Sequence, residues 1–300
     1  MITIFTTAKP FKGKARISQL NALRSWKALD PEIEVMLFGR GEGYDEASRE
    51  LKLLHIPDVE VSARGTPLVS SMFAIAGARG KYELQAYINC DIILTEDFLL
   101  AARRIDLKRF MMIGQRWDMD VDEEMDFKTG LWQKKLKDKM RPESLHPPTG
   151  CDYFLFRRGT WKDLPPLIVG RASYDNWLIY YCRSNGISVI DASDVVTAIH
   201  QNHDYSHLKK GKEEAWSGSE ARNNFSLTGG YDTIFTIIDA DMRITEKGLV
   251  KNYCRGDLYR FFEVKMILNK DSGWGRFGLF GLRTANSLFK RLPIHGRQKA

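Results

Sequence analysis

The first ninety residues alternate between short apolar runs and helical patterns. Residues 2–7 form a β-branched and aromatic run, and apolar residues then recur at helical spacing from Ile17 to Leu29, after a cap expected at Ser18. The alternation continues through four further elements, with strands expected over 34–39 and 84–89 and helices over 44–53 and 68–78. This order predicts an α/β fold in which helices cover both faces of a mostly parallel central sheet.

The pattern becomes mixed after residue 100. Strands are expected over 110–114, 153–156 and 195–200, and a helix over 175–184. No internal repeat or low-complexity linker divides the chain. We therefore expect one continuous domain over residues 1–240, followed by a basic helical appendage over residues 241–300.

Composition narrows the class of protein. Of the 300 residues 43% are hydrophobic and 28% charged, close to the globular average, which excludes disordered and fibrous classes. The longest apolar runs fall well short of the roughly 20 residues that a membrane span needs. The amino terminus begins on a strand without a signal-peptide pattern, so we expect a cytoplasmic protein. The four cysteines show no metal-finger spacing and are expected to be reduced thiols.

The net charge of +7 is concentrated in the tail. Residues 251–300 hold 11 Lys and Arg against 3 Asp and Glu, so this stretch carries +8 and the rest of the chain −1. Such a local charge argues against a nucleic-acid-binding core. Aromatic and basic residues alternate from Trp274 to Arg291, which suits a helix lying on an anionic membrane surface. The alternative is a helix packed on the protein's own body.

Two segments contain candidate metal ligands. Asn89 and Asp91 follow an apolar strand, where ligands bind in open α/β sheets, and their oxygens suit a hard cation and its phosphates. The plainer interpretation of Asp91 is a cap of the next turn. Three of the six histidines fall within eight residues at the end of a later expected strand, and imidazole is a common metal ligand: His200, His203 and His207. A polar, hydrogen-bonded loop is the alternative.

Two further segments have side chains suited to substrate binding. The turn-rich run from His146 to Phe154, which includes Thr149 and Asp152, suits either the floor of a sugar pocket or an ordinary loop. The second run holds Asp175, Asn176 and Trp177, with Asp175 at an expected helix start. By itself such an Asp is more often an N-cap than a catalytic base.

Several common sites are not supported. The glycines at 39, 41 and 43 follow the second expected strand, but Tyr44 stands where a dinucleotide fingerprint needs its last glycine. The sequence also contains neither a P-loop motif nor the G-x-S-x-G of α/β-hydrolases.

Taken in order, these features resemble a GT-A glycosyltransferase over about residues 1 to 240. The resemblance rests on the first strand ending in Thr6 and Thr7, the Asn89-Cys90-Asp91 run, the acidic helix start and the late histidines, and it is greatest to bacterial proteins labelled only as glycosyltransferases. Their HPPTGxDYF, DNWLIY and AIHQNHDYSH stretches match residues 146–154, 175–180 and 198–207.

The resemblance implies a role for each matching residue. Asp91 with His200 or His203 would bind Mn²⁺ or Mg²⁺, while Asn89 departs from the first Asp of the family's DxD motif and weakens the site's charge. The other implied contacts are Thr6 and Thr7 to the nucleotide, Asp175 as the base of an inverting transfer, and His146, Thr149, Asp152, Asn176 and Trp177 to the substrates.

The expected activity is hexosyltransferase-like transfer from a nucleoside diphosphate sugar donor to a glycan or glycolipid acceptor, in polysaccharide biosynthesis of the cell envelope, with peripheral membrane contact through the tail. A nucleotidyltransferase is less favoured because its early Gly-rich basic loop is missing. A catalytically inactive scaffold that binds nucleotide sugars or glycans is the remaining alternative, and Asn89 favours it.

Overall fold

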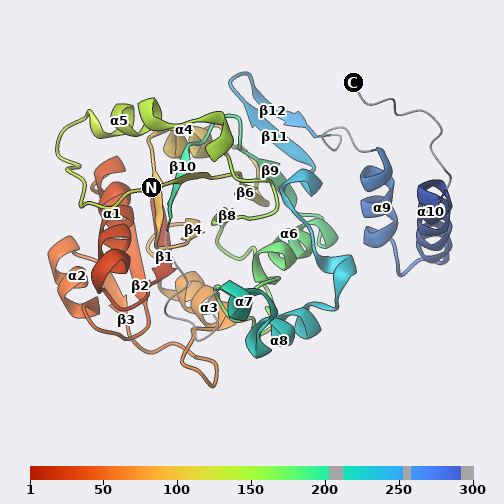
Figure 1. Cartoon of the computed structure of the whole chain (residues 1–300), viewed down its shortest axis with the longest axis horizontal. Helices are drawn as coiled ribbons and strands as arrows, with labels where there is room; N and C mark the ends of the chain where they lie inside the picture. Colours follow the sequence, from red (N-terminus) through yellow and green to blue (C-terminus); the bar gives the residue numbers. More distant parts are fainter. Residues whose placement is uncertain (203–211, 253–257, 292–300) are drawn as a thin grey trace. The chain divides into compact units, whose positions relative to one another are not determined.

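The structure is a computed structural model that describes residues 1–202, 212–252 and 258–291 (Figure 1). The chain forms two compact units, Met1–Lys251 and Asn252–Ala300. The first unit is built on a nine-stranded sheet whose strands follow the order β12-β11-β9-β6-β8-β4-β1-β2-β3. The strands are β1 (Ile2–Thr7), β2 (Glu34–Phe38), β3 (Leu54–Ile56), β4 (Leu84–Ile88), β6 (Phe110–Ile113), β8 (Tyr153–Arg157), β9 (Ser188–Asp191), β11 (Met242–Thr245) and β12 (Gly248–Lys251).

The sheet is mixed and mostly parallel. Five neighbouring pairs are parallel, including β1 with both β2 and β4, and three are antiparallel because β8 and β12 run against their neighbours. The helices of this unit are α1 (Gly13–Leu29), α2 (Tyr44–Leu51), α3 (Val69–Arg79), α4 (Asp97–Arg103), α5 (Trp132–Lys139), α6 (Tyr174–Ser184), α7 (Lys212–Ser217) and α8 (Ser219–Thr228).

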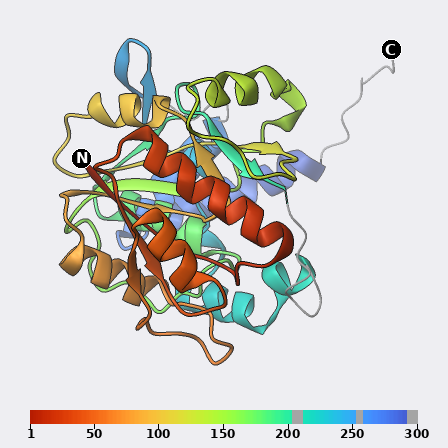
Figure 2. The same cartoon turned by 90° about the vertical axis from the view of Figure 1, so that its left-hand side faces the viewer.

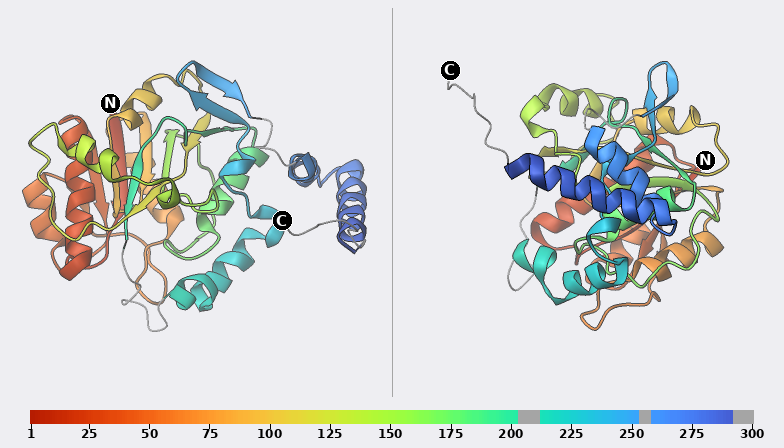
Figure 3. Two further views of the ribbon diagram at one scale, coloured as in Figure 1. Left: turned by 45° about the horizontal axis from the view of Figure 1, so that its top comes forward. Right: turned by 90° about the vertical axis from the view of Figure 1, so that its right-hand side faces the viewer.

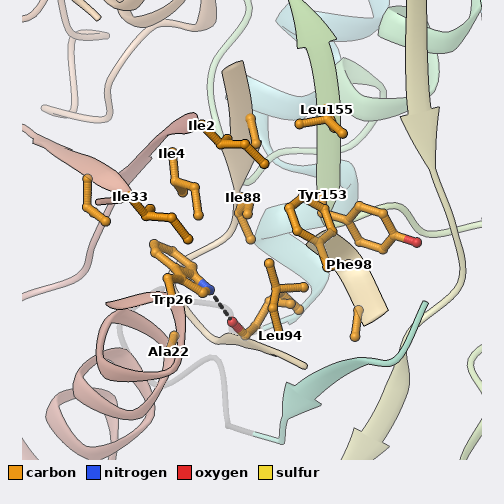
Figure 4. Packing of buried hydrophobic residues seen from close by; sticks show 14 of the residues in the cluster. Ile2, Ile4, Ala22, Trp26, Ile33, Ile88, Leu94, Phe98, Tyr153 and Leu155 are labelled. Carbon is orange, nitrogen blue, oxygen red and sulfur yellow. Dashed lines mark hydrogen bonds between the residues drawn. The ribbon is translucent and has the colours of Figure 1, made fainter. Parts of the chain in front are cut away.

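One face of the sheet packs on α1 and α4. Ile4 and Trp26 are fully buried in one cluster, and the Trp26 indole donates a hydrogen bond to the carbonyl of Ile92 at 2.9 Å. The dashed line from Trp26 in Figure 4 marks this bond. Phe98 of α4 meets the ring of Tyr153 edge-on at 5.9 Å on the same face. Figure 2 shows α1 crossing this face.

The opposite face packs on α3 and α6. Phe5, the neighbour of Ile4 on β1, points the other way and meets Phe73 of α3 at 4.9 Å. Cys182 of α6 lies 3.8 Å from the sulfur of Met111 on β6. Helices therefore cover both faces, and the predicted α/β fold with a mostly parallel sheet is confirmed.

A second, three-stranded sheet has the order β5 (Ile92–Leu94), β10 (Ala198–Gln201) and β7 (Trp117–Met119). The central strand β10 runs antiparallel to β5 and parallel to β7, with His200 opposite Ile92 on one side and opposite Asp118 on the other. Residues about 80 and 110 positions away along the chain therefore meet around His200.

Two expected boundaries differ from the structure. The helix expected to begin after a cap at Ser18 begins at Gly13, and Ser18 is buried within it. The first domain extends to Lys251 rather than to residue 240, because β11 pairs with β9 and joins β12 to the main sheet. Residues 242–251 are thus part of the α/β domain and not of a helical appendage.

The second unit contains α9 (Leu258–Leu268) and α10 (Gly273–Arg291), which pack side by side (Figure 3). In the described ranges, no helix is both long enough and apolar enough to cross a bilayer.

Candidate active site

The candidate site lies at the carboxyl edge of the sheet. Strands β1, β2 and β4 run parallel, so Thr7, Gly39 and Asn89 all lie at or just beyond the same edge. Asp91 follows two residues later, in the turn between β4 and β5. This is the edge at which open α/β sheets bind their ligands.

The backbone of Asp91 is fixed from two directions. Both the backbone N–H and the side-chain amide of Gln201 donate to the Asp91 carbonyl, at 3.1 and 3.2 Å. Gln201 is itself fully buried, donates to the Ser18 carbonyl at 2.7 Å and accepts from Asn21 at 3.1 Å. Helix α1 and strand β10 therefore hold Asp91 in place through a satisfied, buried polar network.

His200 is held beside Asp91. Its Nε2 lies 3.9 Å from Asp91 Oδ2, and its Nδ1 lies 2.9 Å from Asp118 Oδ1. A carboxylate at Nδ1 favours the tautomer whose Nε2 can bind a metal. Two ligands that each lie about 2.1 Å from one cation are separated by about 3 to 4.2 Å, so the observed gap fits a shared divalent ion. His203, the other candidate, lies outside the described residues.

Asp118 and Arg116 join Asp91 and His200 in a charged cluster. The sequence analysis indicated neither Asp118 nor Arg116. Asp118 Oδ2 lies 2.7 Å from Nδ1 of His146, and Arg116 Nε donates to Asp118 Oδ1 at 3.0 Å. Burial opposes ionisation of Asp118, but hydrogen bonds with His200 and His146 and the charge of Arg116 outweigh it and hold the pKa of this carboxyl below its ordinary value.

The contact that lowers the pKa of Asp118 raises the pKa of His200. Burial disfavours its imidazolium, but the hydrogen bond to Asp118 and the charge of Asp91 outweigh this cost and raise the pKa of His200. Asp118 therefore positions the ring and increases its basicity. Both effects are typical of a carboxylate behind a ligating histidine.

Asn89 lies in the cluster, but its amide is engaged at both ends. Its Nδ2 donates to Asp152 Oδ1 at 2.7 Å, and its oxygen accepts from the hydroxyls of Tyr87 at 3.0 Å and Tyr174 at 3.3 Å. The other oxygen of Asp152 accepts from Arg116 at 2.5 Å. An aspartate at position 89 would place two carboxylates against each other, which explains the amide at the first position of the DxD-like motif.

We predict that Asn89→Asp lowers the free energy of unfolding by about 1–3 kcal/mol and does not strengthen metal binding, because it replaces a hydrogen bond by carboxylate repulsion. Urea denaturation and Mn²⁺ titration of the purified variant measure the two effects. The exposed Asn223 on α8 provides a control, Asn223→Asp, which should leave both unchanged. Tighter Mn²⁺ binding with full stability in Asn89→Asp would contradict this role for Asn89.

Asp175 lies on the second residue of α6. The N-cap of α6 is Ser173, so the N-cap interpretation of Asp175 is wrong. Ser173 has a φ of 80°, in the left-handed region that is uncommon for a residue with a Cβ. Asp175 is half-buried, and burial together with the charge of Asp152 raises its pKa to about 6, while backbone amides including that of Cys151 partly oppose the shift. A carboxylate with this pKa suits a general base near neutral pH.

The residues expected to bind the nucleotide differ in access. Thr6 is fully buried and its hydroxyl donates to the Thr7 carbonyl. Its side chain is therefore inaccessible to a nucleotide, which contradicts the expected contact. Thr7 is half-buried at the end of the strand, where its hydroxyl donates to the Phe38 carbonyl at 2.9 Å. Thr7 remains a candidate contact.

The residues expected to bind substrate also lie in different surroundings. His146 and Asp152 belong to the charged cluster through Asp118 and Arg116, and Thr149 is exposed. Asn176 Nδ2 donates to the carbonyl of Phe235 at 2.7 Å and more weakly to that of Thr149 at 3.5 Å. It therefore links α6 to the two loops that contain these residues.

Trp177 packs away from these residues. Its ring lies 5.3 Å from that of Tyr181, which in turn lies 5.4 Å from Trp161. These contacts place Trp177 at the end of an aromatic cluster that continues through Trp161 to Phe156 of β8. The structure gives it a packing role, and the expected sugar contact stays a prediction.

Within the described parts of the chain, no three His, Cys, Asp or Glu side chains are placed to hold one metal ion together. The Asp91 and His200 pair would therefore need further ligands. Phosphate oxygens are suitable ones for a hard divalent ion.

No protein-family model matches the sequence, and neither does any curated protein. Among solved structures, the mannosyltransferase PcManGT from Pyrobaculum calidifontis, in complex with GDP-Man and Mn²⁺, is similar over 66% of this chain and 56% of its own, at 11% identity and a TM-score of 0.42. TarS 1–349 of S. aureus, in complex with UDP-GlcNAc, is similar over 67% of this chain and 58% of its own, at 14% identity and a TM-score of 0.43.

A third similar structure is glucosyl-3-phosphoglycerate synthase from Mycobacterium tuberculosis with Mn²⁺, UDP and phosphoglyceric acid. It is similar over 77% of this chain and 79% of its own, at 14% identity and a TM-score of 0.44. This chain spans less than two thirds of the length of the first two proteins. All three similarities lie at 11 to 14% identity and at TM-scores below 0.5.

Proposed function

We propose that this protein is a glycosyltransferase that moves a sugar from a nucleoside diphosphate sugar to an acceptor with the help of a divalent cation. The observation that carries the proposal is the Asp91 and His200 pair at the carboxyl edge of the sheet, with Asp118 behind His200. In this proposal Asp91 and His200 hold Mn²⁺ or Mg²⁺. The imidazole favours the softer Mn²⁺.

A bound cation would neutralise the negative charge that builds on the departing diphosphate. Asp118 and Arg116 keep the His200 ring and the Asp152 carboxylate in fixed orientations, so little reorganisation is needed when the donor binds. Thr7 and the loop after Phe38 line the same edge and are our candidates for contacts with the nucleotide.

Asp175 would act on the acceptor. In an inverting transfer, its carboxylate accepts the proton of the attacking hydroxyl, and its raised pKa makes it a stronger base than an ordinary aspartate. A glycan or glycolipid of the cell envelope as acceptor, hexosyl specificity, a cytoplasmic location and peripheral membrane contact through the tail remain part of this proposal.

The alternative, a catalytically inactive scaffold, was supported by Asn89, and the structure gives Asn89 another explanation. That hypothesis used Asn89 as a sign of a degraded metal site. In the structure the Asn89 amide is hydrogen-bonded to Asp152, Tyr87 and Tyr174, and these bonds give the amide a structural role that does not depend on a degraded metal site.

The proposal is tested by measuring release of free nucleoside diphosphate from a panel of UDP and GDP sugars, with Mn²⁺, Mg²⁺ or EDTA and with candidate acceptors. We expect one donor to raise the unfolding temperature only when the cation is present, since a ligand that binds the folded state alone stabilises it. We also expect that donor to release diphosphate faster when an acceptor is added. Metal-dependent binding without turnover for any acceptor would favour the scaffold.

A further inference from the structure

Helix α10 exposes three large aromatic side chains on one face. Trp274 is 90% exposed, Phe277 82% and Phe280 75%. Their spacing places them within about a third of the helix circumference, with Phe277 in the middle. Isolated exposed apolar residues are common in proteins, but three neighbouring rings exposed to this degree indicate an interaction surface.

The packing of α10 against α9 fixes which way this face points within the pair. A Cβ at Gly278 would lie 2.5 Å from the sulfur of Met266 on α9, so the two helices approach closely at this glycine. Arg283 Nε also lies 3.1 Å from Glu263 Oε1 of α9. Around the helix, Gly278 lies about 100° from Phe277 in one direction and Arg283 about 120° from it in the other, so the side that contacts α9 is opposite Phe277. The aromatic face is not used in the contact with α9.

Exposed basic side chains occur on both helices of the pair. Lys265 and Arg276 are exposed, and the tail from residue 251 onward carries a net charge of +8. Aromatic side chains next to basic ones suit the headgroup region of a bilayer, where rings enter the interface and cations meet acidic lipids. An acidic protein surface would satisfy the charges, but it would not by itself account for three adjacent rings exposed on the same face.

We propose that the helix pair of α9 and α10 docks on an anionic membrane surface, with Trp274, Phe277 and Phe280 inserted among the lipid headgroups. The occupant of this face is a lipid bilayer. The proposal makes specific the peripheral membrane contact that the proposed function includes, and it is independent of the transferase activity because it depends only on residues of the second unit.

The test measures sedimentation of the full-length protein with vesicles of phosphatidylcholine containing 30% phosphatidylglycerol, and with vesicles of phosphatidylcholine alone. Wild-type protein should bind the anionic vesicles more tightly and lose affinity with added salt, because each cation near the surface contributes about fivefold. The triple variant Trp274→Ser, Phe277→Ser, Phe280→Ser should bind about 30-fold more weakly or worse, since partial burial of each ring contributes about threefold or more.

A matched control removes three exposed apolar side chains from the first unit: Leu131→Ser, Trp216→Ser and Tyr231→Ser. This control should bind vesicles like the wild type. Equal vesicle binding by both triple variants, or equal binding of the wild type to neutral and anionic vesicles, would overturn the proposal. A wild-type dimer that ignores vesicles and becomes a monomer in the α10 variant would also overturn it, by assigning the face to a second copy of the chain. Nucleotide binding in solution, measured alongside, reports on the proposed transferase separately.

Discussion

Replacing Asp91 by alanine is expected to abolish Mn²⁺-dependent binding of the donor nucleotide, with a loss in affinity of about 100-fold or more, because one of the two proposed protein ligands to the cation is removed. The fold should survive the change. The backbone carbonyl of Asp91, and not its side chain, accepts the bonds from Gln201 that fix this turn. We therefore expect the free energy of unfolding to change by less than about 1 kcal/mol.

Calorimetric titration of the donor in Mn²⁺ and in EDTA measures this effect. The exposed Asp106 supplies the control, Asp106→Ala, which removes a carboxylate elsewhere on the surface and should leave the titration unchanged. In the absence of nucleotide, Mn²⁺ should bind weakly even to the wild type, since Asp91 and His200 alone leave most of the coordination shell to other ligands. Equal donor affinity in EDTA and Mn²⁺ for the wild type would remove the metal from the mechanism.

His200→Ala should reduce donor binding in a similar way, but its effect on stability should differ from that of Asp91→Ala. Removing the imidazole takes a hydrogen-bond donor from the half-buried Asp118. The cost of such a loss is about 1–3 kcal/mol. Denaturation curves of the two variants should therefore differ, because only His200→Ala removes a hydrogen bond within the charged cluster.

The order of the elements could be predicted from the sequence because its signals are local. Strands buried on both faces, such as 2–7 and 84–88, appear as short apolar runs, and helices show their own period. The start of α1 was missed because its first turn, from Gly13 to Arg16, is polar and basic and has no apolar period. The 242–251 hairpin was missed because its two strands have only four residues each and gain their stability by pairing with β9.

The site was only partly predictable for a related reason. Asp91 and His200 each follow or end a strand, and this position alone made them candidates. Asp118 lies on a strand of three residues whose pairing with β10 spans 82 positions of the chain, and no local pattern encodes that contact. The alternating aspartates at 118, 120 and 122 were the available signal, and they are equally typical of a solvated loop.

The raised pKa of Asp175 leads to an expectation about stability as well as activity. Its folded value of about 6 lies above the ordinary 3.8, so the native state binds a proton more tightly than the unfolded chain does. The stabilisation that this proton gives is complete below about pH 4 and is lost as the pH rises through 6. At pH 7 the ionised Asp175 therefore lowers the free energy of unfolding, a cost that an amide of the same shape does not have.

We accordingly expect Asp175→Asn to keep donor binding, to lower turnover by about 100-fold or more through loss of the base, and to raise the free energy of unfolding at pH 7 by about 1–3 kcal/mol, with no gain at pH 4. Wild-type turnover should fall below about pH 6 as the carboxylate takes up a proton. Steady-state kinetics and urea denaturation at both pH values measure these effects. Asp97→Asn is the matched control, because Asp97 also lies in a first helix turn but pairs with Lys137 at 3.0 Å, so that variant should lose stability and keep its turnover. Normal turnover in Asp175→Asn would exclude Asp175 as the base, whereas lost turnover without the gain at pH 7 would show that burial of its charge has little cost.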